Sequence, residues 1–151
     1  TYMLYEKLTN DMKEAMKSHD KESLSTLRLL KSAVDLYLVN NNLERNHASD
    51  EVVIDVASKQ VKTHKESIEE FKKGNRLDLV EGLEKEIKLL STYLPEQMSE
   101  EEIISNIDKV FEEIKPTSMK DMGAIMKALN PIFKGKADMK FVNEIVKSKL
   151  N

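Results

Sequence analysis

Histidine, serine and threonine are present, but their spacing fits no catalytic or metal site. The three histidines are His19, His47 and His64, and none belongs to an H-E-x-x-H or similar ligand pair. A hydroxyl nucleophile needs a nearby base and an oxyanion site, usually on a glycine-supported turn. The chain has only four Gly and no G-x-S-x-G motif, and it has no Cys. The sequence therefore predicts no catalytic residues, no metal and no cofactor.

Charge is distributed unevenly along the chain. The overall formal charge is −3, yet residues 95–114 hold seven acids and one base, whereas residues 115–151 hold eight lysines and three acids. A basic segment of this kind is typical of a surface that binds phosphate groups. Solvated helix faces also carry many lysines, so both interpretations stay open.

The turn at residues 133–138 is the better candidate for a phosphate site. Lys134 and Lys136 flank Gly135, which can adopt a positive φ or a close backbone approach. The next helix would begin directly afterwards, and its free N–H groups favour anions. The alternative is an ordinary helix–helix turn with lysines for solubility. Aromatic residues make up only 5% of the chain, which favours contact with the backbone of a folded RNA over base stacking.

A second group of lysines lies on the helix expected after residue 50. At 100° per residue, five of its lysines fall on one side, beside the apolar face. They are Lys59, Lys62, Lys65, Lys72 and Lys73. Glutamates share this side at i,i+4 spacing, which favours a solvated face with weak ion pairs over a ridge that follows a phosphate backbone.

The elements that must position these residues are all expected to be helices. Apolar residues recur at helical spacing, and no segment shows sustained alternation. A first helix is expected over residues 3–18, and Asp20, Ser49, Ser99, Ser118 and Asp138 are expected to cap or start later helices. The expected ends are Asn40–Asn42, Gly74–Asn75, Leu94–Pro95, Pro116 and Asn130–Pro131.

The apolar stripes predict which side chains face the cores. The expected inward residues are Leu4, Leu8, Met12, Met16; Leu24, Leu27, Leu30, Val34, Leu38; Val53, Ala57, Val61, Ile68, Phe71; Leu79, Leu83, Ile87, Leu90; Ile103, Ile107, Val110, Ile114; Met122, Ile125, Met126, Leu129; and Phe141, Ile145, Val146. The sequence thus predicts an all-α fold of seven helices. Residues 1–94 form a four-helix amino-terminal part, and residues 95–151 form a compact three-helix part.

Several motifs, in order along the chain, resemble those of the YqeY family. They are LRLLKSA at residues 27–33, KQVK at 59–62, GNRLDL at 74–79, YLPEQ at 93–97 with SEEE at 99–102, MGxxM at 122–126 and KGKAD at 134–138. The resemblance covers essentially the whole chain from Met3, which is the expected natural start. One departure is Met139, where the family usually has Gly.

The resemblance implies a relation to transfer RNA. The family is a stand-alone relative of the tail domain of the B subunit of the glutamine-dependent aspartyl/glutamyl-tRNA amidotransferase. In that enzyme the tail resembles an appendage that grasps tRNA, while the chemistry resides elsewhere. Family-level labels read carbon–nitrogen ligase with glutamine as amido donor, but the residues here offer no nucleophile and no nucleotide loop.

The leading hypothesis is a non-catalytic helical module that binds tRNA or another folded RNA. Its candidate RNA-binding residues are Lys127, Lys134, Gly135, Lys136, Lys140, Lys62, Lys65 and Arg76. One alternative is a protein-interaction module that docks on an amidotransferase or synthetase through exposed residues around Tyr93–Met98. The other is glutamine-dependent amidation by the chain itself. Without an apolar run of membrane-spanning length or a secretory h-region, a cytoplasmic location is expected.

Overall fold

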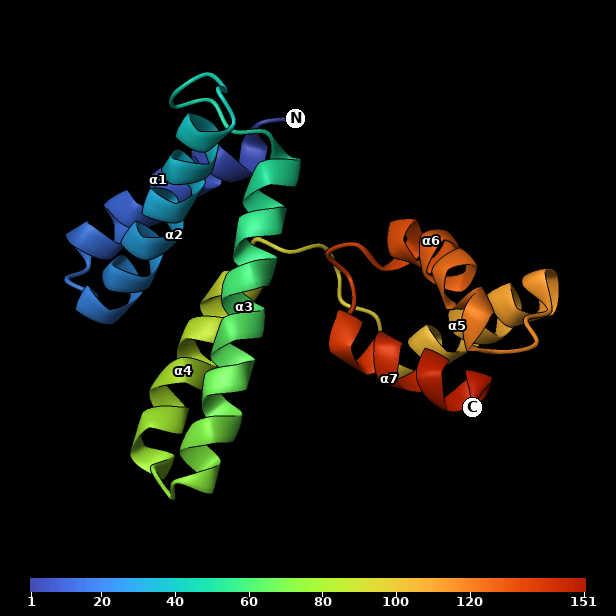
Figure 1. The fold of residues 1–151 in the computed structure, drawn as a ribbon. Coiled ribbons are helices and arrows are strands. Elements are labelled where there is room, and N and C mark those ends of the chain that lie inside the picture. The colour runs from blue at the N-terminus through green and yellow to red at the C-terminus, as the bar shows by residue number, and fades with distance from the viewer. The chain divides into compact units, whose positions relative to one another are not determined.

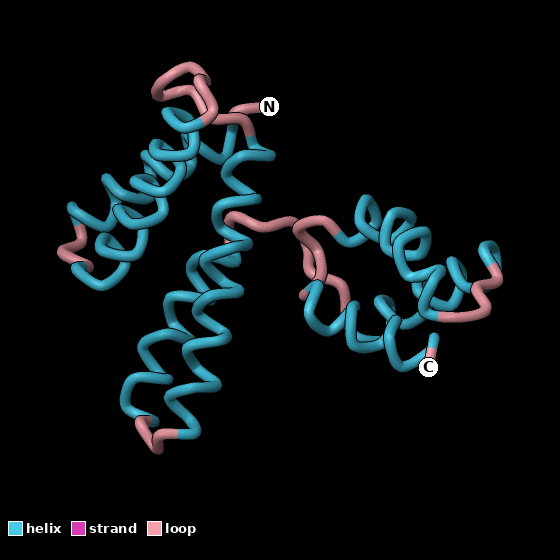
Figure 2. The backbone as a smooth tube through the Cα atoms, in the orientation of Figure 1, coloured by secondary structure: helices cyan, strands magenta, loops and turns pink.

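A computed structural model describes residues 1–151, and every regular element in it is helical (Figures 1 and 2). The helices are α1 (Met3–Lys17), α2 (Lys21–Asn40), α3 (Asp50–Lys73), α4 (Leu77–Ser91), α5 (Glu100–Ile114), α6 (Met122–Phe133) and α7 (Met139–Leu150), with a 3-10 turn η1 (Met119–Asp121) before α6. The predicted all-α class with seven helices is confirmed. No helix is both long and apolar enough to cross a bilayer.

The chain divides into two compact units. The amino-terminal unit, Thr1–Pro95, contains α1 to α4, and the carboxy-terminal unit, Glu96–Asn151, contains α5 to α7. In the first unit α1 pairs with α2, α3 pairs with α4, and α2 also packs against both members of the second pair. In the second unit α6 packs against both α5 and α7.

Most helices begin where a short polar side chain can accept a backbone N–H. The Asp20 carboxylate accepts from the N–H of Ser23 at 3.1 Å, and the Ser99 hydroxyl accepts from the N–H of Glu102 at 3.1 Å. Ser49 caps α3 in the same way. These side chains satisfy donors that the first helical turn leaves without an intrahelical partner. The predicted starts at these three positions are confirmed.

Four helices are followed by a residue in the left-handed conformation: His19 after α1, Asn42 after α2, Asn75 after α3 and Lys115 after α5. Asn75 follows Gly74 with a φ of 57°, and Lys115 has a φ of 53° directly before Pro116. Asparagine tolerates this conformation better than most residues. The predicted ends at Gly74–Asn75 and Pro116 are confirmed.

The expected end of the sixth helix at Asn130–Pro131 is wrong. α6 continues through Pro131 to Phe133. Proline lacks the N–H that would bond to the carbonyl of Lys127, but Pro131 lies in the last turn, where little helix remains to be disrupted. The buried ring of Phe133 packs in the core of its unit and holds that turn in place.

The expectations for the fourth helix also need correction. α4 ends at Ser91 rather than Leu94, and Thr92 is its carboxy-terminal cap. Val80 is buried, whereas the expected core residue Leu79 is 38% exposed. Val80 continues the helical spacing of Leu83, Ile87 and Leu90, which places it on the inward face.

Each unit has its own apolar core. The buried residues of the amino-terminal core are Tyr5, Leu8, Ala15, Leu27, Leu30, Val34, Leu38, Ala48, Val52, Val53, Val56, Ala57, Val61, Leu90 and Tyr93. Those of the carboxy-terminal core are Ile103, Ile107, Val110, Ile125, Leu129, Phe133, Val142 and Val146. Most predicted stripes are confirmed, but Met16 and Ile114 are exposed, and the stripes missed Val142.

Candidate nucleic-acid interface

The turn between α6 and α7 has a fixed backbone. The carbonyl of Phe133 accepts the N–H groups of Lys136 at 2.9 Å and Ala137 at 3.1 Å. Gly135 has a φ of 72°, so the predicted positive φ is confirmed. L-residues with a side chain rarely adopt this conformation, which explains why glycine stands here.

The segment that precedes α5 ties down the same turn. The side-chain amide of Gln97 donates to the carbonyl of Gly135 at 2.8 Å, and the N–H of Met98 donates to the carbonyl of Lys136 at 2.8 Å. Residues almost forty positions apart are thereby joined within the carboxy-terminal unit. The side chains of Lys134 and Lys136 are exposed on this fixed turn.

The first N–H groups of α7 contribute less to anion binding than the sequence suggested. The carboxylate of Asp138 accepts the N–H of Lys140 at 3.0 Å and caps the helix. A carboxylate at a helix amino terminus occupies the position that a bound anion would take. Electrostatic attraction at this turn therefore depends on the lysine side chains.

The remaining carboxy-terminal candidates extend along the two helices. Lys140 is exposed in the first turn of α7, and Lys127 is exposed on α6, two turns before the connection. The fold thus places five of the eight predicted residues in one unit: Lys127, Lys134, Gly135, Lys136 and Lys140.

The other three candidates belong to the amino-terminal unit. Lys62 and Lys65 are exposed on α3. Arg76 precedes α4 and forms a two-point ion pair with Asp78, with Nε–Oδ1 and Nη2–Oδ2 distances of 3.2 and 3.1 Å. The Arg76 guanidinium lowers the pKa of the Asp78 carboxyl. A phosphate at Arg76 would have to compete with this carboxylate.

Lys149 at the carboxy-terminal end of α7 contacts α5. Lys149 Nζ lies 2.6 Å from Oδ1 of Asp108 and 5.2 Å from the centre of the Phe111 ring. Both acceptors are on α5, the acidic helix. The acidic and basic segments of the sequence therefore belong to one unit, which contains nine lysines and ten acidic residues.

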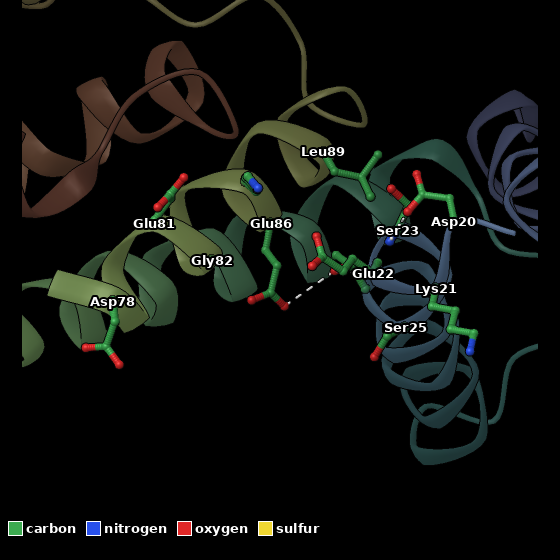
Figure 3. A pocket seen from close by; sticks show the side chains of 12 residues that line it. Asp20, Lys21, Glu22, Ser23, Ser25, Asp78, Glu81, Gly82, Glu86 and Leu89 are labelled. Atoms are coloured by element: carbon green, nitrogen blue, oxygen red, sulfur yellow. Dashed lines mark hydrogen bonds between the residues drawn. The ribbon is translucent and has the colours of Figure 1, made fainter. Parts of the chain in front are cut away.

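A groove between α2 and α4 has the wrong charge for nucleic acid. Its volume is about 840 Å³, and Figure 3 shows side chains from both helices along it. Its carboxylates are Asp20, Glu22, Asp78, Glu81 and Glu86, against Lys21 and Lys85. Phosphate groups would be repelled here.

Three polar side chains meet beside this groove. The hydroxyl of Thr26 donates to Oε1 of Glu86 at 3.4 Å, and Nε2 of His64 lies 3.5 Å from the same oxygen. The carboxylate thus stands between the hydroxyl and the imidazole. A nucleophile needs the base within its own hydrogen-bond reach. Nε2 of His64 is buried and has no hydrogen-bond partner in the structure.

Two lysine–aspartate–tyrosine clusters in the amino-terminal unit were not predicted. In one, Asp35 accepts from the Tyr5 hydroxyl at 2.9 Å and from Lys31 at 2.8 Å. Burial, followed by the hydrogen bond to Asp35, raises the pKa of Tyr5. The other cluster joins Lys7 and Asp11 to Tyr93. The lysine–aspartate pairs at i,i+4 were visible in the sequence, but nothing there identified the tyrosine partners.

The structure also corrects the expected docking segment around Tyr93–Met98. Tyr93 is 1% exposed, and Leu94, Pro95 and Met98 are half-buried. Only Glu96 and Gln97 are exposed. The segment therefore offers little apolar surface to a protein partner.

Fold and candidate site together define a small all-helical protein of two compact units, one of which displays lysines on a fixed turn. Residues 5–150 match the family model described as Yqey-like protein. The chain therefore belongs to the YqeY family, which confirms the resemblance found in its motifs.

The relatives include proteins with mitochondrial names. An uncharacterised protein of Schizosaccharomyces pombe is 36% identical over 86 residues, which cover 57% of this chain and 68% of that protein. Altered inheritance of mitochondria protein 41 from Lachancea thermotolerans is 35% identical over 115 residues, or 74% of this chain and 59% of the relative. The Pyrenophora tritici-repentis protein of the same name is 28% identical over 145 residues, which cover 91% of this chain and 76% of that protein. The match thus spans under two thirds of the Lachancea protein.

Proposed function

We propose that this chain is a non-catalytic RNA-binding module whose ligand is tRNA or another folded RNA. The observation that carries the proposal is the α6–α7 turn, where two exposed lysines flank a glycine on a hydrogen-bonded backbone. A fixed backbone reduces the conformational entropy lost when lysines engage phosphates. The relation of the family to an amidotransferase tail supports tRNA as the RNA class.

The proposed contact surface begins at this turn and extends to Lys127 and Lys140. Lysine binds phosphate oxygens as a point charge and reads no sequence. The interface is therefore expected to recognise the backbone and shape of an RNA. Lys62, Lys65 and Arg76 are secondary candidates on the other unit, and the ion pair with Asp78 makes Arg76 the weakest of them.

The experiment is a titration of fluorescently labelled bulk tRNA with the full chain at several salt concentrations. Saturable binding that strengthens as salt falls, and that duplex DNA competes for poorly, is expected. The double variant Lys134→Gln, Lys136→Gln should weaken binding and lower the slope of log K against log salt by about 0.9 for each lost duplex phosphate contact.

A matched control is Lys85→Gln with Lys88→Gln on α4. Both residues are exposed, and the net charge changes by the same amount. This variant should retain the affinity and the slope of the unmodified chain. If both double variants lost the same amount of affinity for tRNA, the loss would be explained by net charge alone. That result would contradict a localised binding site.

Glutamine-dependent amidation is the alternative that the family label suggests. The purified chain, supplied with a mischarged tRNA, glutamine and ATP, should form no amidated product, because its sequence offers no ammonia-generating nucleophile and no nucleotide-binding loop. Product formation would replace the binding proposal with an enzymatic one.

The location of the protein is part of the proposal. The cytoplasm is the location expected from the sequence, and it contains the proposed ligand. The Lachancea and Pyrenophora relatives carry names that assign those proteins to mitochondria. Imaging of the full-length tagged protein in its own cells would decide between the two compartments.

A further inference from the structure

One face of α2 carries an apolar stripe that no helix of the amino-terminal unit covers. Leu29 and Leu36 are each 59% exposed, Val39 is 52% exposed, and Leu43 in the following turn is 46% exposed. Ser25 and Ser32 are exposed on the same side. Within α2 the spacing of these residues is 4, 3, 4 and 3, which is the heptad spacing of a helix–helix seam, and Leu43 follows beyond the helix end at Asn40. We call residues 25, 29, 32, 36, 39 and 43 the α2 seam.

The seam contrasts with the other outward faces of this chain. The exposed side of α3 carries charges at nearly every turn, including Lys59, Lys62, Lys65 and Glu66. The seam itself contains no charged residue. Lys31 and Asp35, which lie on the same helix, point to the side of α1, where they bond to each other and to Tyr5. A stripe of large exposed apolar residues on a highly charged protein marks an interaction surface.

We propose that the α2 seam is the interface of a homodimer, in which α2 of one copy packs antiparallel against α2 of a second copy. The proposal goes beyond RNA binding and does not depend on it. A two-fold interface requires a surface that is complementary to itself. The order of large and small residues in the seam meets this requirement in one antiparallel register.

In that register, a residue of one copy lies opposite a residue of the other copy when their two numbers add up to 68. Leu36 then lies opposite Ser32 of the other copy, and Leu29 lies opposite Val39. Leucine knobs face smaller residues at each level, so the two helices can approach closely. No leucine meets another leucine at the same level.

Charges at the two ends of α2 fit the same arrangement. The amino-terminal end carries Asp20, Lys21 and Glu22, and the segment after the helix carries Glu44 and Arg45. Antiparallel packing places each end beside the opposite end of the other copy, where acids can meet bases. It also aligns the helix dipoles favourably. A parallel pair would bring like charges together.

The expected dimer is weak. The helical part of the seam spans four turns, which is about 22 Å, and it buries less surface than the ~800 Å² per partner of a standard interface. Sedimentation of the full chain over a range from micromolar to near-millimolar concentration should show reversible dimerisation. Leu36→Glu should raise the dissociation constant by about tenfold or more, because it introduces a charge into an apolar contact.

Leu77→Glu is the matched control. Leu77 is 60% exposed and lies on α4, outside the seam, so the substitution introduces the same charge at the same exposure. This variant should dimerise like the unmodified chain. Circular dichroism would show that both variants remain folded, which is expected because both positions are exposed.

A disulfide experiment tests the register independently of affinity. The chain has no Cys, so single cysteines can be placed at will. In the proposed register Leu29→Cys of one copy lies opposite Val39→Cys of another, whereas two copies of Leu29→Cys are separated by about 15 Å along the helix axis. Oxidation of a mixture should therefore give mainly the 29–39 species, which differs in mass from both homodimers.

Three results would overturn the proposal. One is a chain that stays monomeric up to near-millimolar concentration. Another is a dimer that Leu36→Glu leaves unchanged. The third is a spin label at Ser32→Cys that is immobilised in the monomer, because the seam would then be covered within one molecule. RNA binding would be unaffected by each of these results, so the two proposals fail separately.

Discussion

The hydroxyl of Tyr93 donates a hydrogen bond of 2.5 Å to Oδ2 of Asp11, which stands 82 positions earlier in the chain. Lys7 donates to the same oxygen at 2.7 Å, and its ammonium lies 4.0 Å from the centre of the Tyr93 ring. The ring itself is buried in the amino-terminal core. This contact fastens the residue that precedes Leu94–Pro95 to α1, and so fixes where the amino-terminal unit ends.

Tyr93→Phe should lower the free energy of unfolding of the amino-terminal unit by about 1–3 kcal/mol. The ring packing is kept, but Asp11 loses one of its two donors. Urea unfolding followed by circular dichroism measures the change. Tyr2→Phe is the control, since Tyr2 is 50% exposed and should show no effect. Equal stability of the Tyr93→Phe variant and the parent would contradict a stabilising role for this bond.

Acid should weaken the same cluster. Burial alone would raise the pKa of Asp11, but the hydrogen bonds from Lys7 and Tyr93 and the charge of Lys7 outweigh it, so the pKa lies below its ordinary value of 3.8. A carboxyl with a lowered folded-state pKa stabilises the fold above its unfolded pKa, and this stabilisation is lost as pH falls through the folded pKa. Unfolding measured between pH 7 and pH 2 should thus depend less on pH in Asp11→Asn than in the parent. Parallel pH profiles would contradict this assignment.

Gly135→Ala should destabilise the carboxy-terminal unit by about 1–2 kcal/mol, because an L-residue is strained at a φ of 72°. Gly82→Ala is the comparison with the opposite expected sign. A Cβ at Gly82 meets nothing within 4 Å, and alanine favours the helix by roughly 0.5–1 kcal/mol. Thermal unfolding of the two variants should therefore shift in opposite directions. A stabilised Gly135→Ala would show that the turn does not need its left-handed residue.

Pro131→Ala should stabilise α6 only slightly, by no more than about 1 kcal/mol, because Pro131 lies in the last turn. Alanine restores an N–H that can donate to the carbonyl of Lys127 and removes the clash of the proline ring. Part of the gain is offset because alanine leaves the unfolded chain more flexible. Pro116→Ala, outside any helix, isolates this second effect and should be slightly destabilising. A loss of stability in both variants would mean that Pro131 fits the last turn without cost.

The helices and most of their starts could be predicted because their signals are local. Asp20, Ser49 and Ser99 each act on an N–H only three residues away, and the apolar stripes follow directly from helical periodicity. Pro131 was misjudged because proline in a last turn costs little when a buried side chain such as Phe133 follows it. Leu79 was misjudged because two adjacent apolar residues near a helix start cannot be distinguished without knowledge of the neighbouring helix.

The candidate site was predictable only in its local part. The sequence identified Gly135 and its flanking lysines, and the positive φ follows from glycine chemistry. It could not reveal that Gln97 and Met98 bind the carbonyls of this turn, because nothing in a sequence links residues almost forty positions apart. The role of the eight candidate residues in RNA binding stays a prediction.

The two cores have no residue in common. Cooperative unfolding spreads through shared buried contacts, so each half of this chain is expected to melt on its own. Scanning calorimetry should then record a total heat larger than the van't Hoff enthalpy of either transition. Between the two midpoints a half-folded species would be populated, with a complete helical unit attached to a chain that proteases can digest.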